Sequence, residues 1–158
     1  MLPLIPILNR NKELLEKLLG LLALERNAFG LRETQELETV TAVKKEVIEE
    51  LESLEKKQYS VLTKFGVINP KKPVKGAFKA WLNEQDSDSE ICILVEECEA
   101  LLIKCKSKNT ANEQILNTLR KRNQAMLEIL KGQSKNHRVY TAKGASKPVS
   151  SKHTIGNA

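Results

Sequence analysis

The chain has 158 residues, which is enough for one domain and a tail but not for a second core. Aromatic residues make up only 4% of it, so its apolar surface is aliphatic and favours packed helices over a β-sheet. Residues 1–130 carry 20 basic and 20 acidic side chains, whereas residues 131–158 carry six basic ones and no acid, which places the whole net charge of +6 at the C-terminal end. A basic nucleic-acid-binding face is therefore not expected on the folded body.

The N-terminal stretch is apolar, but it lacks a basic leader, contains two prolines and is followed at once by charged residues. We therefore expect neither a signal peptide nor a membrane span there. A first helix is predicted over residues 9–29, because Asn9 or Asn11 can cap it and Gly30 follows its end. Its stripe recurs at spacings of three and four, through Leu15, Leu18, Leu22, Glu25 and Phe29.

The second run has the most regular pattern in the chain. Heptad a and d spacing is kept for four repeats, with Glu and Lys outside it. The pattern predicts a helix over residues 33–65 that stops at Gly66. Its stripe consists of Leu37, Val40, Lys44, Val47, Leu51, Leu54, Gln58, Val61 and Phe65.

A loop over residues 67–76 leads into a short segment, residues 77–82, which is expected to cap one end of a bundle. A third long helix is then predicted from about residue 88, with its N-cap among residues 86–89. Residues 106–114 are polar but contain no Pro or Gly, and the same register returns after them. We interpret this run as one continuous helix.

From residue 133 onward the chain is rich in Ser, Lys, Gly and Ala and shows no apolar periodicity. Such a segment cannot bury enough surface to offset its conformational entropy, so residues 133–158 are expected to form a flexible basic tail. Residues 1–132 are expected to form an all-α domain. The predicted architecture is an antiparallel bundle or extended coiled-coil hairpin of three long helices with a short capping helix.

The sequence contains no recognisable catalytic motif. It lacks a metalloprotease helix motif, a glycine-rich phosphate loop and a nucleophile elbow, and both histidines, His137 and His153, lie in the tail. Cys92, Cys98 and Cys105 form no C-x-x-C pair and are interpreted as small apolar side chains in a reduced, cytoplasmic protein. We therefore expect no enzyme, no metal and no cofactor.

Two charged residues stand where the stripes would carry aliphatic ones. Glu25 lies on the first predicted helix and Lys44 on the second, and a short turn between these helices makes them antiparallel. One hypothesis is a structural ion pair across the helices, which costs stability but fixes register. The alternative is that both side chains extend into solvent along their aliphatic stems.

The C-terminal half of the last helix is apolar around more than one side, and such a helix favours a partner on each flank. One hypothesis is that its outward flank accepts an amphipathic helix of another protein. The candidate binding residues are Ile115, Leu119, Met126 and Leu130. The alternative is that packing within the chain covers both flanks.

The order of these features resembles the FlgN family of flagellar export chaperones. The resemblance rests on Leu24-Glu25, on Lys44 followed by apolar residues, on Trp81-Leu82, and on the pair Asn109 and Asn112 in the last helix. Leu-Glu-Ile-Leu-Lys-Gly at 127–132 and Val-Tyr-Thr-Ala-Lys-Gly at 139–144 complete it. The likeness covers nearly the whole chain.

This resemblance implies a cytoplasmic chaperone without direct membrane insertion. Its clients would be the hook-associated proteins of the hook–filament junction, bound through their C-terminal helical regions by the last helix and tail. It would deliver them to the cytoplasmic domain of the export gate's membrane protein, with Tyr140 as the matching contact.

Two other functions remain open at this stage. A sister secretion chaperone or a coiled-coil adaptor would share every periodicity described above. A protein that binds nucleic acid through its basic tail would instead show affinity that falls steeply with salt.

Overall fold

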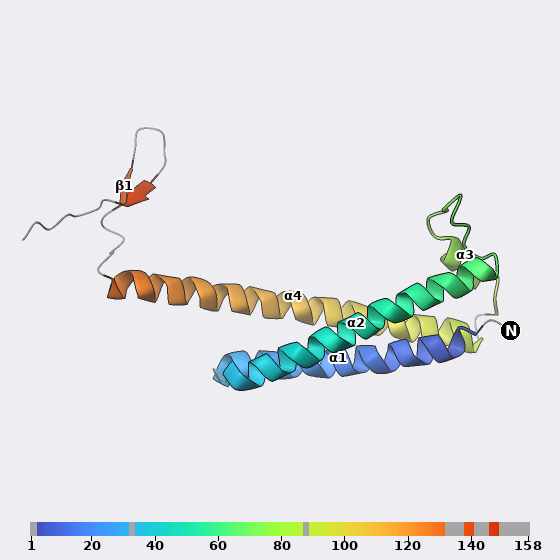
Figure 1. The fold of residues 1–158 in the computed structure, drawn as a ribbon, viewed down its shortest axis with the longest axis horizontal. Coiled ribbons are helices and arrows are strands. Elements are labelled where there is room, and N and C mark those ends of the chain that lie inside the picture. Colours follow the sequence, from blue (N-terminus) through green and yellow to red (C-terminus); the bar gives the residue numbers. More distant parts are fainter. Residues whose placement is uncertain (1–2, 32–33, 87–88, 132–137, 141–145, 149–158) are drawn as a thin grey trace, which may run out of the picture. The chain divides into compact units, whose positions relative to one another are not determined.

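The computed structural model describes residues 3–31, 34–86, 89–131, 138–140 and 146–148. These residues form the helices α1 (Ile5–Leu31), α2 (Thr34–Lys64), α3 (Ala77–Asn83) and α4 (Glu90–Leu130), and the strands β1 (Arg138–Tyr140) and β2 (Ser146–Pro148) (Figure 1). The all-α fold with three long helices and a short one is confirmed. The chain divides into two compact units, Met1–Leu116 and Asn117–Ala158.

The first helix begins earlier than the expected residue 9. It starts at Ile5, so Pro6 falls in the first turn, where a helix needs no backbone N–H donor. Leu4 and Leu8 are buried beside Leu62 of α2 and Leu94 of α4. The apolar N-terminal stretch is therefore part of the core, which periodicity alone could not show because prolines interrupt it.

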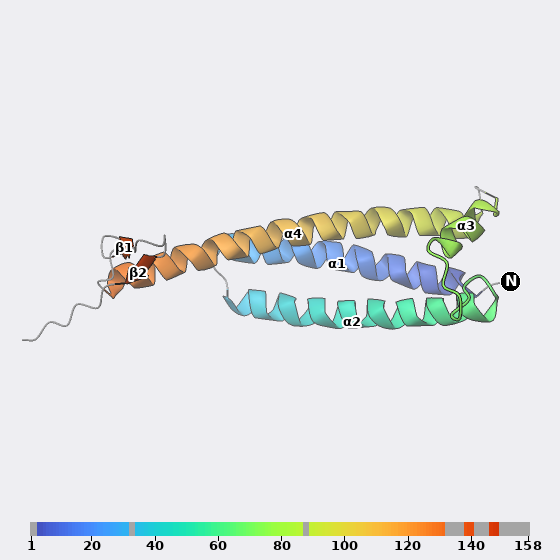
Figure 2. The same cartoon turned by 90° about the horizontal axis from the view of Figure 1, so that it is seen from above.

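The α1 and α2 helices lie side by side and run in opposite directions (Figures 1 and 2). Their contact is a row of buried aliphatic side chains at heptad spacing. It comprises Leu14 and Leu21 of α1 and Val40, Val47 and Leu54 of α2. The regular stripe predicted for the second helix is thus its contact with the first.

Gly66 ends α2. Its φ of 75° lies in the left-handed region, and the next amide, that of Val67, donates to the carbonyl of Leu62 at 2.9 Å. After a loop, α3 packs Phe78 and Trp81, stacked with centroids 6.0 Å apart, against the cluster that contains Leu62 and Leu94. The short segment therefore covers one end of the bundle, as expected.

Ser89 caps α4: its Oγ accepts the amide of Cys92 at 3.4 Å. The helix then continues without a break through residues 106–114 to Leu130, which confirms the prediction of one long helix. Of the expected tail, the structure describes only β1 and β2, an antiparallel pair that places Val139 opposite Lys147. Sequence periodicity did not predict these strands, and the flexible tail over 133–158 stays a prediction.

A ladder of side-chain donors fixes α4 against α1. The thiol of Cys98 donates to the carbonyl of Leu8 at 3.6 Å, and the thiol of Cys105 to that of Leu15 at 3.4 Å. Seven residues further along α4, the Asn112 amide donates to the next carbonyl of the series, on Leu22, at 2.9 Å. The residue numbers of the donors on α4 and of the acceptors on α1 rise together, so α1 and α4 run parallel here.

Burial raises the pKa of the Cys98 and Cys105 thiols above their ordinary values. Both side chains therefore stay protonated near neutral pH and remain able to donate. Their small volume is what lets the α4 backbone approach α1 closely enough for these contacts.

We expect Cys105→Leu to destabilise the protein by about 1–3 kcal/mol, because Cys105 is buried and a larger side chain would force the two helices apart. Cys105→Ser keeps a donor of similar size and serves as the control. Urea unfolding monitored by circular dichroism measures both variants. A Cys105→Leu variant as stable as the natural protein would show that close approach is not required.

Candidate functional site

The most polar feature of the core is a cluster of four side chains where α1, α2 and α4 meet. Its centre is Glu25 of α1, a carboxylate only 7% exposed. Lys44 of α2 lies with its Nζ 3.0 Å from Glu25 Oε1 and 3.2 Å from Oε2. The two residues singled out from the sequence thus form an ion pair across the antiparallel helices.

Two asparagines of α4 complete this cluster. Asn112 donates from Nδ2 to Glu25 Oε2 at 2.8 Å, and Lys44 donates to Asn109 Oδ1 at 3.1 Å. Asn109 in turn donates to Glu113 at 2.9 Å. The buried carboxylate therefore receives three charge-assisted or amide contacts, which offset part of the cost of removing it from water.

The roles of Asn109 and Asn112 could not be derived from the sequence. In the sequence they stand out only because they match a family pattern. The structure shows that Asn112 contacts Glu25 and that Asn109 contacts Lys44. A signal was nevertheless present, since Cys98, Cys105 and Asn112 are spaced by seven and so share one face of α4. A polar amide on a face of small buried side chains indicates a buried acceptor opposite.

The four candidate binding residues all lie on α4, but they differ in exposure. Ile115 and Leu119 are half-buried. Met126 and Leu130 are 55% and 79% exposed, and their neighbours Leu127 and Ile129 are exposed as well. The last turns of α4 thus present apolar side chains that are at least half exposed.

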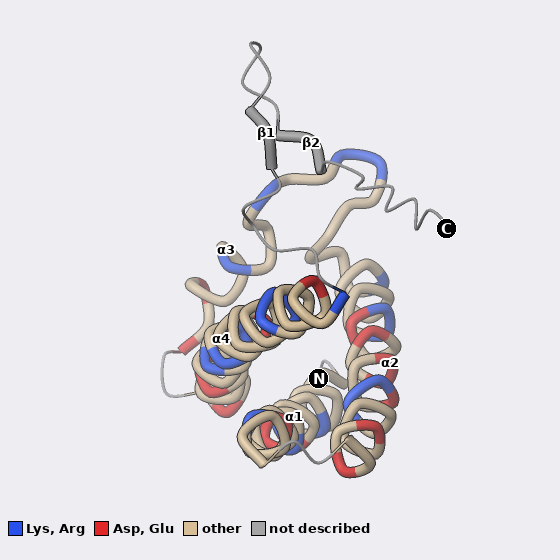
Figure 3. Tube along the Cα trace, turned by 90° about the vertical axis from the view of Figure 1, so that its left-hand side faces the viewer, with Lys and Arg blue, Asp and Glu red and all other residues tan. Residues whose placement is uncertain are grey.

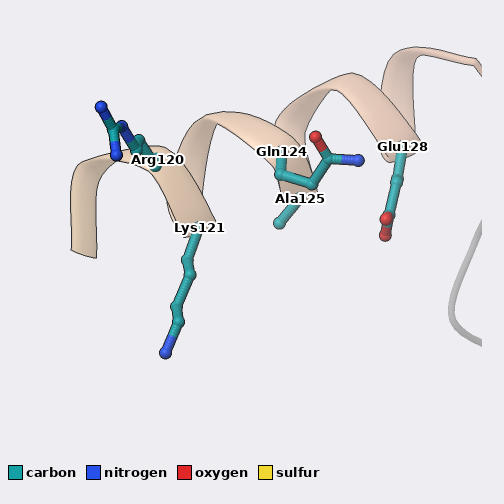
Figure 4. Close-up of a pocket in the computed structure, with 5 residues that line it drawn as sticks. All are labelled: Arg120, Lys121, Gln124, Ala125 and Glu128. Atoms are coloured by element: carbon teal, nitrogen blue, oxygen red, sulfur yellow. The ribbon is translucent and has the colours of Figure 1, made fainter. Parts of the chain in front are cut away.

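Polar residues alternate with these apolar ones on the same stretch of α4. Arg120, Lys121, Gln124, Ala125 and Glu128 line a shallow depression of about 450 Å³ (Figure 4). All five come from one helix, so the depression is open surface beside α4 and not an enclosed cavity.

Tyr140, the predicted contact with the export gate, lies on β1, and its side chain falls outside what the structure describes.

The described residues carry no candidate metal site. No three His, Cys, Asp or Glu side chains among them are grouped so that they could hold a metal ion. Both histidines lie outside the described residues. In the same part of the chain, no helix is both long enough and apolar enough to cross a membrane.

Fold and site together define the class of this protein. It is a bundle of long helices held in register by a buried polar cluster, and its last long helix ends in exposed apolar side chains. Within that class, the family model described as FlgN protein matches residues 3–148. The chain belongs to the FlgN family and is a flagellar export chaperone. Comparison with curated proteins gives no match, and neither does comparison with solved structures.

We expect Lys44→Met alone to destabilise the protein by roughly 2–4 kcal/mol, because it leaves the Glu25 carboxylate buried without its cation. The double variant Glu25→Leu/Lys44→Met should recover a large part of that loss. A double-mutant cycle from urea unfolding gives the coupling free energy, expected to exceed about 1 kcal/mol. Additive effects would exclude a stabilising pair.

Proposed function

We propose that this chaperone works in the cytoplasm and binds the hook-associated proteins of the hook–filament junction. It holds their C-terminal helical regions, keeps them soluble and unassembled, and delivers them to the cytoplasmic domain of the export gate's membrane protein. Membership of the FlgN family supports this proposal. The structural observation that best supports the proposal is the exposed apolar end of α4.

The client site consists of Ile115, Leu119, Met126 and Leu130. They recur at spacings of four, seven and four, which keeps them near one face of a helix. A client helix laid along that face would bury side chains that are now 55% exposed at Met126 and 79% at Leu130. Fully burying such a side chain contributes about 1.5–3 kcal/mol, which makes this helix face a favourable contact.

Tyr140 is the proposed contact with the export gate. This role comes from the family resemblance and from the place of Tyr140 beyond the end of α4. A contact there would leave the client face of α4 free while the chaperone is at the gate.

We expect Leu119→Glu/Met126→Glu to abolish client binding and to leave the helical content nearly unchanged. Two carboxylates would be desolvated by a bound client helix, whereas in the free protein Met126 is open to solvent and tolerates charge. Isothermal titration with a purified hook-associated protein measures binding, and circular dichroism measures folding.

The matched control is Asn117→Glu/Gln124→Glu, which adds the same charge, at the same spacing of seven, to exposed polar positions on the opposite face of the same helix. It should bind the client normally. If the Leu119→Glu/Met126→Glu variant unfolds, these residues belong to the core of the free protein and the client site lies elsewhere. If it binds the client as tightly as the natural protein does, the proposed site is wrong.

Tyr140→Ala should leave client affinity within a few-fold of the natural value but reduce secretion of the client. The physical reason is that Tyr140 lies outside the helix face proposed to hold the client. Titration gives the affinity, and the amount of hook-associated protein in the culture medium gives the secretion. Loss of client affinity would assign Tyr140 to the client instead.

A further inference from the structure

A groove of about 300 Å³ lies within Met1–Leu116, between α1, α2 and α4. Figure 3 looks along these helices and shows α2 and α4 on either side of α1. Leu8 and Leu15 of α1, both buried, form the base of the groove. Leu51 of α2 and Leu102 of α4 line its sides, and Phe78 of α3 lines it as well. Its deepest surface is therefore aliphatic.

The lining follows helical periodicity on all three long helices. Each helix contributes residues at spacings of three and four, over two turns. They are Leu8, Asn11 and Leu15 on α1, Leu51, Glu55 and Gln58 on α2, and Val95, Glu99 and Leu102 on α4. Rows of this kind form the holes into which the apolar side chains of another helix insert, so a fourth helix fits the groove better than a loop does.

The edges of the groove are acidic. Glu55 on α2 and Glu99 on α4 are both exposed, and neither forms a hydrogen bond or an ion pair with any described residue. No Lys or Arg is among the lining residues. Two unpaired carboxylates on opposite edges repel phosphate groups and attract cationic side chains, so they favour a basic partner over a nucleic acid or an anionic lipid.

We propose that this groove is a second docking site, which takes one amphipathic helix of a partner protein with basic residues on both edges of its apolar stripe. Leucine-sized side chains of that helix enter the space above Leu8 and Leu15. Its Lys or Arg residues pair with Glu55 and Glu99. Binding converts the three-helix bundle into a four-helix one.

This site shares no residue with the client face of α4 and differs from it in charge. Its existence does not rest on the function proposed above.

Charge decides which partner helix is preferred. Exposed ion pairs contribute about 0.2–1 kcal/mol each to binding, so two of them favour a basic helix over an acidic one by about tenfold.

The test uses two synthetic helical peptides of about 18 residues, or five turns. Both carry the same Leu stripe, flanked by Lys in one peptide and by Glu in the other. Affinities come from fluorescence anisotropy, and methyl NMR of the full chain locates the site. We expect the Lys peptide to bind about tenfold more tightly and to shift the methyl signals of Leu8, Leu15 and Leu102.

Glu55→Gln/Glu99→Gln should remove that preference without unfolding the protein, since both side chains are exposed. The matched control is Glu46→Gln/Glu90→Gln, nine residues earlier on the same two helices and therefore on their opposite faces. It should keep the preference. Leu119→Glu/Met126→Glu should keep it too, which separates this site from the client site.

Three results would overturn the proposal. The first is equal binding of both peptides to the natural protein. The second is a set of shifted methyl signals confined to Met126 and its neighbours on α4. The third is concentration-dependent self-association that shifts the signals of Leu8, Leu15 and Leu102 in the absence of peptide, because the groove would then hold a second copy of the chain.

Discussion

The arrangement of the first unit depends on one buried carboxylate. Glu25 lies in an aliphatic core, where an unpaired charge would cost several kcal/mol, and it is tolerated because Lys44 and Asn112 supply its donors from two other helices. Sliding α2 or α4 by one turn would separate these donors from their acceptor by about 5.4 Å. Apolar stripes alone accept such a slide far more readily, so the polar contacts select one register.

The ladder along α4 extends the same constraint over a longer distance. Cys98, Cys105 and Asn112 each donate to an α1 carbonyl, and their small side chains keep the two helices close. The packing of α4 and of α2 against α1 leaves a groove that all three helices line. The register contacts and the groove are therefore two consequences of the same packing.

Function follows from what this packing leaves uncovered. The end of α4 is apolar and exposed at Met126 and Leu130, and we propose that the client binds there. The groove edged by Glu55 and Glu99 offers a second surface of different charge. A chaperone with two such surfaces can distinguish its partners by charge as well as by apolar fit.

The sequence by itself determined the helical class, the stripes of α2 and α4, the continuity of α4 and the family, because these depend on local periodicity and residue order. It also singled out Glu25 and Lys44 as residues out of place in their stripes. Only the tertiary structure decided that Leu4 and Leu8 belong to the core, that Asn109 and Asn112 complete the polar cluster, and where the groove lies. The physical reason is that these features join residues that can be 90 or more positions apart, and periodicity along one helix says which face is apolar but not which helix that face will meet.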